Sequence, residues 1–191
     1  MLNYHITRIF VHEIALHVDH NSDDFSMPFT KKVIGEPALK PGVVIETPRL
    51  DSIHDCIIAS HDLINTFHAC TLKELLSLPV FTFVRTVYAC VVLIKISITA
   101  LVPGSELGRV ITDDDIKTEQ YITRTLYQLM KASSGDMNTP AGKFAMILTT
   151  IQSWYRTRID ELVPGNAASV DSPMSSLKPT KIESPGVSAP R

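Results

Sequence analysis

Apolar residues recur every three or four positions along much of this chain, which predicts a series of amphipathic helices. We expect the first helix over residues 2 to about 19, with one apolar face, and the second over residues 49 to 69. Residues 20–48 between them contain four prolines and no sustained period, so we expect a long surface connection with a short extended piece at residues 42–46. The apolar positions of the two helices are Leu2, Ile6, Ile9, Phe10 and Ile14, and then Leu50, Ile53, Ile57, Ile64 and Phe67.

A capping pattern marks a short third helix. Thr71 precedes Glu74 by three residues, which is the spacing at which the two side chains cap a helix start reciprocally. Pro79 ends this helix, because the residue before a proline avoids the helical conformation. The most apolar stretch of the chain, from Phe81 to Leu101, follows immediately and is long enough for a helix of its own.

Two more helices are predicted towards the C-terminus. Thr112 and the acidic run Asp113–Asp115 predict the start of a helix that continues to the sequence SSGD at residues 133–136. Thr139 and Pro140 predict the start of the last helix, with a cap and a first-turn proline. The apolar positions expected in the two helices are Ile122, Leu126 and Met130, and then Phe144, Leu148, Ile151, Trp154 or Tyr155, and Leu162.

Residues 164–191 differ in composition from everything before them. They contain five prolines, six serines and no aromatic residue, which predicts a disordered tail. The expected fold class is therefore all-α, with an irregular multi-helix bundle around a buried apolar helix. We expect one helical domain at residues 1–163 and a disordered Pro/Ser-rich tail at residues 164–191.

The stretch at residues 80–101 raises the question of a membrane span. Twelve of its residues are Leu, Ile, Val or Phe and favour insertion by roughly 4–7 kcal/mol, whereas Arg85 and Lys95 oppose insertion by roughly 5–7 kcal/mol. Composition alone therefore leaves the question open. The amphipathic helices on both sides need an apolar partner for their faces, which favours the central helix of a soluble bundle over a single-span membrane protein.

Charge and cysteine content narrow the functional classes. The formal net charge is −2, and removing the net +1 of residues 164–191 leaves −3 for the helical part, which does not favour direct DNA binding by that part. Three widely spaced cysteines, Cys56, Cys70 and Cys90, fit a reducing compartment better than a disulfide framework. With no C-x-x-C pair, no zinc cluster is expected within this chain, and the N-terminus lacks the pattern of a signal peptide.

The seven histidines do not form a recognisable metal motif. His12 and His17 lie five residues apart, so their side chains diverge by roughly 140° around a helix instead of sharing a face. His54, His61 and His68 are spaced by seven residues, and neighbours in this row lie about 10.5 Å apart along a helix axis, too far to share one metal ion. A polar stripe beside the apolar one is the favoured interpretation.

No residue pattern points to catalysis. The acidic run Asp113–Asp115 is interpreted as a helix cap, and the three cysteines as core residues instead of nucleophiles. The pair Trp154 and Tyr155 is typical of a core, although it would also suit a ligand pocket. No nucleophile-elbow, phosphate-loop or dinucleotide-binding motif occurs, so we expect no enzymatic activity and no cofactor. Ser172-Pro173 and Ser184-Pro185 are weak candidates for proline-directed phosphorylation.

Four stretches of the chain match one known family in their order and spacing. The longest contains a short helix that ends in Leu-Pro, and then an apolar helix with an aromatic-Ala step and a V-V-L-x-K pattern. Together they resemble the regulatory region of fungal zinc-cluster transcription factors. The four stretches are YHITRIFVHEIALH at residues 4–17, CIIASHDLINTF at residues 56–67, LKELLSLPVFTFVRTVYACVVLIKI at residues 72–96 and FAMILTTIQSWY at residues 144–155.

The resemblance implies an all-helical regulatory domain in which the apolar helix is buried and its basic residues, such as Lys95, reach the surface. It also implies a nuclear transcription regulator, acting on a metabolic or biosynthetic gene cluster through other transcription factors or the transcription machinery. A small-molecule effector is compatible with this family, but no residue of the chain identifies one.

The chain departs from the family in one respect. The family's six-cysteine binuclear zinc cluster and basic DNA-contacting segment are not found in the sequence, so we assign no DNA-contacting residue, metal ligand or catalytic residue. We expect the chain to correspond to the C-terminal part of such a factor, beginning within the domain, with DNA contacted only indirectly or through a zinc cluster outside this sequence. The alternative is a partner-binding helical module that modulates an intact factor.

Overall fold

The computed structural model describes residues 1–16, 37–40 and 42–163, and this part of the chain is helical with no strand. The expected all-α fold is confirmed, while the expected tail at residues 164–191 and most of the connection at residues 20–48 lie outside the described residues. The elements are α1 (Leu2–Glu13), η1 (Ile14–Leu16), α3 (Thr47–His68), α4 (Leu72–Ser77), α5 (Val80–Leu101), η3 (Leu107–Arg109), α6 (Asp113–Ile116), α7 (Thr118–Ser133) and α8 (Pro140–Leu162).

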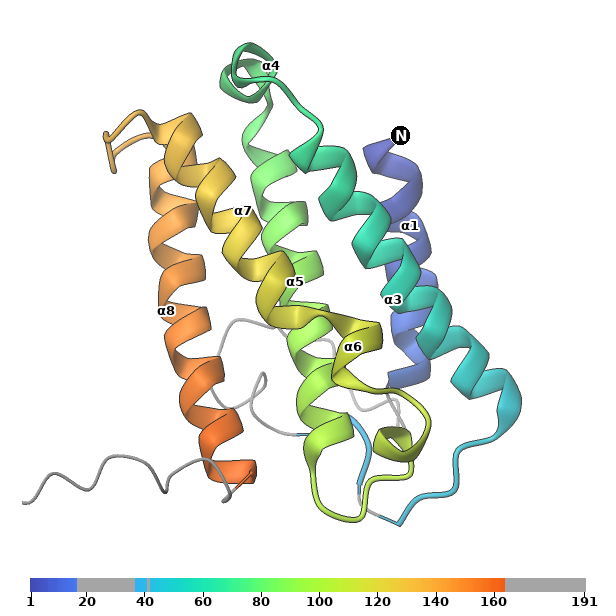
Figure 1. The fold of residues 1–191 in the computed structure, drawn as a ribbon. Helices are drawn as coiled ribbons and strands as arrows, with labels where there is room; N and C mark the ends of the chain where they lie inside the picture. The colour runs from blue at the N-terminus through green and yellow to red at the C-terminus, as the bar shows by residue number, and fades with distance from the viewer. Residues whose placement is uncertain (17–36, 41, 164–191) are drawn as a thin grey trace, which may run out of the picture.

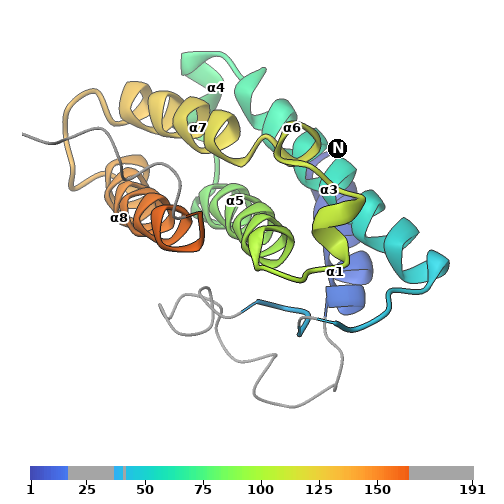
Figure 2. The same cartoon turned by 60° about the horizontal axis from the view of Figure 1, so that its bottom comes forward.

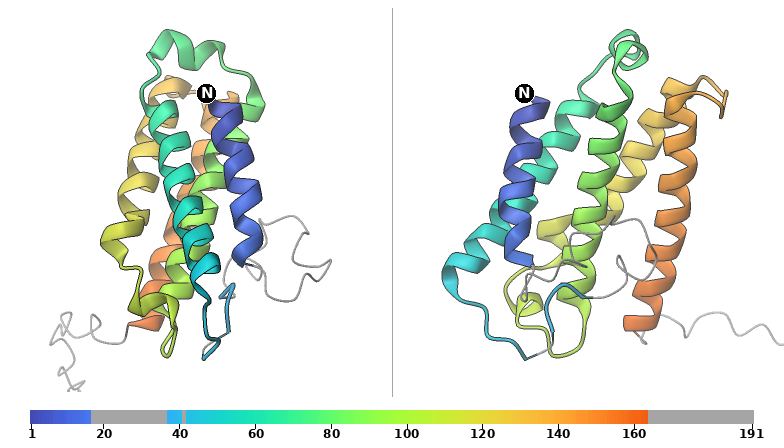
Figure 3. Two further views of the ribbon diagram at one scale, coloured as in Figure 1. Left: turned by 90° about the vertical axis from the view of Figure 1, so that its right-hand side faces the viewer. Right: turned by 180° about the vertical axis from the view of Figure 1, so that it is seen from behind.

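The long helices form two layers (Figures 1 and 2). In the first layer, α1, α5 and α8 run side by side in the same direction, with α5 in the middle (Figure 3, right). In the second layer, α3 and α7 run in the opposite direction and cover one side of α5. The helix α5 contacts all four of the other long helices, so the core of the protein is built around it.

Burial is nearly complete along the second half of α5. Every residue from Ala89 to Thr99 is buried. Among the described helices, α5 is the one that is long and apolar enough to span a membrane, but 78% of its most apolar window is buried inside the protein. Lys95 is only 6% exposed, so the expectation that its side chain reaches the surface is wrong.

The predicted helix starts at Thr71 and Thr139 are confirmed by their hydrogen bonds. The Thr71 backbone N–H donates to the Glu74 carboxylate at 2.7 Å, and the Glu74 N–H donates to the Thr71 hydroxyl at 3.4 Å. The Thr139 hydroxyl accepts a hydrogen bond from the Gly142 N–H at 3.1 Å. Both threonines therefore satisfy backbone N–H groups that a helix start leaves without a partner.

The prediction of a single helix from residue 113 is wrong, because the helical conformation is interrupted at Lys117. This residue adopts a left-handed conformation with φ of 52°, which separates α6 from α7. In a continuous helix Ile116 and Thr118 would point about 200° apart. The break allows both side chains to be buried, with Thr118 donating to the Leu93 carbonyl at 3.4 Å.

One smaller expectation is also wrong. In α7, Met130 is 50% exposed and Leu129 takes the buried position, together with Ile122 and Thr125. Residues 42–46, where a short extended piece was expected, belong to no helix or strand, and the backbone of Glu46 is extended. The first helix ends as a 3-10 turn at Leu16, and the three further residues predicted for it lie outside the described residues.

Shortening a side chain in the buried half of α5 is expected to destabilise the protein strongly. Leu93→Ala removes a fully buried side chain and should lower the free energy of unfolding by about 2–5 kcal/mol. Tyr127→Ala on the outer surface of α7 should change it by about 0.5 kcal/mol or less, because Tyr127 is 68% exposed. Urea unfolding followed by circular dichroism measures both, and equal effects would contradict a core centred on α5.

Candidate interaction surface

The outer side of α1 carries apolar side chains that the other described residues leave exposed. Ile6 and Ile9 are buried against the bundle, but Phe10 and Ile14 are 54% and 49% exposed. The apolar face predicted for this helix is therefore only partly covered, since its apolar residues are divided between the core and the surface.

Polar contacts with α3 line one side of α1. The Arg8 guanidinium lies 3.5 Å from the Asp62 carboxylate and 3.7 Å from that of Asp55. His5 lies 3.7 Å from Asp62, and His12 lies 4.0 Å from Asp55. Partly exposed pairs of this kind contribute only about 0–1 kcal/mol each. They act together with the larger contribution from the buried apolar side chains of α1, and in this orientation Phe10 is left exposed.

The first turns of α5 continue this apolar surface. Val80 and Phe81 are each 52% exposed and Val84 is 38% exposed. The half-buried ring of Tyr88 lies 5.4 Å from the ring of Phe10, which joins the two helices. We refer to this surface as the α1–α5 face, and it comprises Phe10, Ile14, Val80, Phe81, Val84 and Tyr88.

Two polar contacts hold the α1–α5 face together. The Tyr88 hydroxyl donates a hydrogen bond to the Glu13 carboxylate, and the Arg85 guanidinium donates one to the Asn3 side-chain carbonyl. Burial, together with the negative charge of Glu13, raises the pKa of Tyr88, so the hydroxyl keeps its proton and remains a donor. The face is therefore a fixed surface between two helices.

A shallow cavity lies at the N-terminal end of the α1–α5 face. Its volume is about 280 Å³, just below the range for small-molecule pockets, which is about 300–1,000 Å³. Such a volume suits one or two inserted side chains. It is formed where the starts of α1 and α5 meet the connection after α4, and its lining includes Leu2, Asn3, Leu78, Pro79, Phe81 and Arg85.

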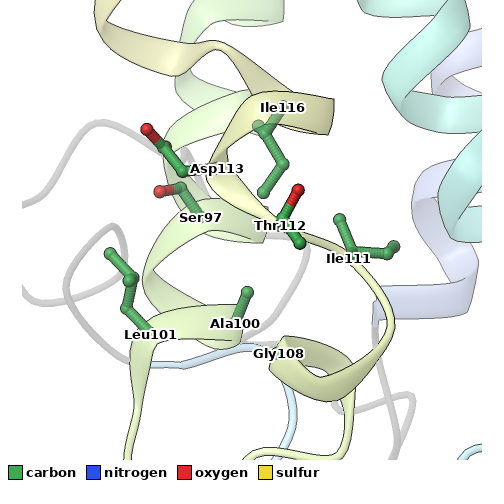
Figure 4. A pocket seen from close by; sticks show the side chains of 8 residues that line it. All are labelled: Ser97, Ala100, Leu101, Gly108, Ile111, Thr112, Asp113 and Ile116. Carbon is green, nitrogen blue, oxygen red and sulfur yellow. The ribbon is translucent and has the colours of Figure 1, made fainter.

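A second cavity lies between the C-terminal half of α5 and the segment that leads into α6. It measures about 180 Å³, and Figure 4 shows the side chains of α5 facing those of the α6 segment across it. Its polar groups are the hydroxyls of Ser97 and Thr112 and the carboxylate of Asp113. The Ser97 hydroxyl is already bonded to the Tyr155 hydroxyl at 2.7 Å.

The chemistry of this second cavity is limited. Its lining contains no histidine or cysteine, and its remaining residues are Ala100, Leu101, Gly108, Ile111 and Ile116. Its two hydroxyls are already hydrogen-bonded, that of Ser97 to Tyr155 and that of Thr112 to the Asp115 carboxylate, so neither is paired with an effective base as an activated nucleophile would be. Tyr155 was one of two residues considered for a ligand pocket, and it is buried beneath this cavity, whereas Trp154 is half-buried on α8.

The row of histidines on α3 is distributed among separate partners. The His61 ring stacks on Tyr121 at 4.3 Å between centroids and donates to the Ile116 carbonyl at 2.8 Å. The His68 ring nitrogen Nε2 lies 3.0 Å from the Thr125 hydroxyl. His54 is exposed. His61 and His68 thus each contribute to a helix contact, and the described residues contain no group of three or more metal-ligating side chains.

The remaining candidates have structural roles where the structure describes them. Cys56 and Cys90 are fully buried, and burial raises the pKa of both thiols, that of Cys90 to about 12, so neither is a nucleophile at neutral pH. Cys70 is half-buried with a raised pKa. Asp115 accepts hydrogen bonds from the Thr112 backbone N–H and hydroxyl at 2.8 and 2.7 Å, which confirms the acidic run as a cap.

Two candidates cannot be placed. His17 and the Ser-Pro pairs at residues 172–173 and 184–185 lie outside the described residues. The α1–α5 face itself was not predicted from the sequence. Its signal was present in the width of the apolar stripe on α1, where Phe10 and Ile14 lie beyond the arc that one packed helix buries.

Comparison with known proteins identifies no relative of this chain. No protein-family model, no curated protein and no solved structure matches it. Its function is therefore inferred from its own residues and contacts, and from the resemblance of its four sequence stretches.

The buried His68 makes the stability of the protein depend on pH. Burial, together with the positive charge of Arg124, lowers the pKa of His68 from 6.5 to about 4. Below pH 6.5 His68 becomes protonated in the unfolded chain but stays neutral in the folded protein. The free energy of unfolding is therefore highest above pH 6.5 and falls as the pH drops towards 4. The expected loss over this range is about 2–3 kcal/mol.

His68→Gln keeps a polar group near Thr125 and should flatten this dependence in urea unfolding between pH 4.5 and pH 7 (roughly the window between the two pKa values). His54→Gln is the matched control, because His54 is exposed, and it should retain the slope of the parent protein. If His68→Gln also retained that slope, the claim that a buried neutral His68 causes the pH dependence would be refuted.

Proposed function

We propose that this chain is the helical regulatory region of a nuclear transcription regulator and that it acts through protein partners that bind the α1–α5 face. The observation that carries the proposal is the exposure of Phe10, Phe81 and Val84 on adjacent helices of an all-α bundle. Large exposed apolar patches mark interaction sites in folded proteins, and the contact of Phe10 with Tyr88 joins the exposed residues of the two helices. Aromatic side chains are also the residues that contribute most to protein–protein binding.

The arrangement of the helices supports the family resemblance. The Leu78-Pro79 step separates α4 from α5, and α5 is largely buried, as the resemblance implies for the apolar helix. Lys95 of the V-V-L-x-K pattern departs from the resemblance, because it is buried as well. Burial of α5 also favours a core helix over a membrane span. The target is expected to be a metabolic or biosynthetic gene cluster, as in the family that the chain resembles.

A protein partner is favoured over nucleic acid by the charges on the surface. The whole chain carries a formal charge of −2, and Arg85 is the one basic residue that lines the cavity at the end of the face. Nucleic-acid interfaces need several lysines or arginines to neutralise phosphates. DNA is therefore contacted indirectly, or through a zinc cluster outside this sequence.

The chain fused to an unrelated DNA-binding domain should change transcription of a reporter that carries the matching operator. Phe10→Gln should abolish the change, because it removes an exposed ring at the centre of the α1–α5 face. Tyr127→Gln should retain it, since Tyr127 is equally prominent but lies on α7 in the second layer. Both variants are first checked for unchanged unfolding.

A reporter that stays unchanged with a folded fusion would contradict the proposal that the chain regulates transcription by itself. If co-expression of the chain then altered the activity of an intact zinc-cluster factor, the alternative of a modulating partner module would be favoured. If neither changed, both would be excluded.

A further inference from the structure

We propose that the cavity at the N-terminal end of the α1–α5 face binds an acidic-apolar peptide segment, in which a bulky apolar side chain enters the cavity and a neighbouring carboxylate pairs with Arg85. This inference rests on the proposed partner-binding function of the face and adds the chemistry of the partner. It concerns the part of the surface lined by Leu78, Pro79, Phe81 and Arg85.

The apolar requirement comes from the lining of the cavity. Leu78, Pro79 and Phe81 are joined there by Leu2 of α1, and the ring of Phe81 is 52% exposed at the rim. A volume of about 280 Å³ accommodates a side chain of the size of leucine or phenylalanine. Burying such a side chain contributes favourably in proportion to the apolar area removed from water, and it also covers Phe81.

The acidic requirement comes from Arg85. Its guanidinium donates to the neutral Asn3 amide and lies 4.7 Å from the centre of the Phe81 ring, but no described carboxylate forms an ion pair with it. A guanidinium has five N–H groups, so several donors remain for a ligand. The contacts with Asn3 and Phe81 hold the group in place at the edge of an apolar cavity, where a carboxylate bound in bidentate fashion gains most.

The start of α5 at the cavity has the same sign of charge as Arg85. The helix α5 has no side-chain cap and no acidic residue in its first turn. In contrast, α4 and α6 begin with capping boxes that include Glu74 and Asp115. The positive end of the dipole of α5 is thus left uncompensated beside Arg85, and it favours a negatively charged group on the occupant.

A pair of labelled peptides tests the inference on the full chain. The acidic peptide has about 15 residues, enough for a marginal helix, with Leu and Phe on one face and Asp and Glu flanking them. The neutral peptide replaces each Asp and Glu by Asn and Gln. Fluorescence anisotropy gives the affinities, and amide chemical shifts in the NMR spectrum show whether Asn3, Phe81 and Arg85 respond.

Arg85→Gln should weaken binding of the acidic peptide about tenfold and leave binding of the neutral peptide unchanged. Arg85→Lys should recover much of the affinity, because it keeps the charge. Arg124→Gln removes a charge from the exposed surface of α7 and serves as the matched control, with affinity unchanged. Unfolding measurements confirm that each variant is folded.

Equal affinities for the two peptides, or an Arg85→Gln variant that binds the acidic peptide like the parent, would overturn the inference. A protein that is dimeric and becomes monomeric on the Arg85→Gln change would assign the cavity to a second copy and also overturn it.

If Arg85 has no effect but Phe10→Gln abolishes the reporter response, the proposed function stands and only the partner chemistry fails. If the peptide binds as expected but the reporter stays unchanged, the transcriptional proposal fails alone.

Discussion

The burial of α5 is the constraint on which the rest of this structure depends. A 22-residue helix of this composition must be shielded from water, and α3 and α7 cover it from one side while α1 and α8 flank it. Three of its hydroxyl side chains form hydrogen bonds within the same arrangement. The hydroxyls of Thr86 and Thr99 donate to carbonyls one turn earlier, and Ser97 is bonded to Tyr155 of α8. A helix that resembles a membrane span is thereby held as the centre of a two-layer bundle.

The same arrangement explains why one surface is left uncovered. The helices α3 and α7 cover only one side of α5, and no described helix covers the opposite side at its start. The helix α1, whose Arg8 pairs with two aspartates of α3, is oriented so that Phe10 contacts Tyr88 of α5 and remains exposed. The α1–α5 face is thus the part of the two helices that the packing of the core leaves exposed. Arg85 and the uncapped start of α5 then give one end of this face a positive character, which separates it from a purely apolar patch.

Much of the fold could be predicted from the sequence, because helix periods and caps act locally. The helix at Thr47–His68 and the capping box at Thr71 follow from patterns within a few residues. The break at Lys117 could not be predicted, since it depends on Ile116 and Thr118 both reaching a core built from distant residues. The burial of Lys95 has the same origin, because only the packing of the other helices decides which side of α5 is covered.

The candidate site was the least predictable part. A stripe of apolar residues does not reveal how much of it another helix covers, so Phe10 and Ile14 were indistinguishable from Ile6 and Ile9 before the rotation of α1 was known. The pairing of Arg85 with Asn3 joins residues far apart in the sequence and left no local signal. The histidine row on α3 illustrates the reverse case, in which a regular spacing suggested chemistry and the structure shows packing contacts.

Amide hydrogen exchange of the full chain in plain buffer, read by mass spectrometry, tests the central role of α5 most directly. If α5 is the core of a folded bundle, the amides of Ala89–Thr99 should exchange only through global unfolding and should be the most protected of the chain, without lipid or detergent. Rapid exchange in buffer, with protection appearing only when lipid vesicles are added, would contradict the bundle and assign this helix to a membrane.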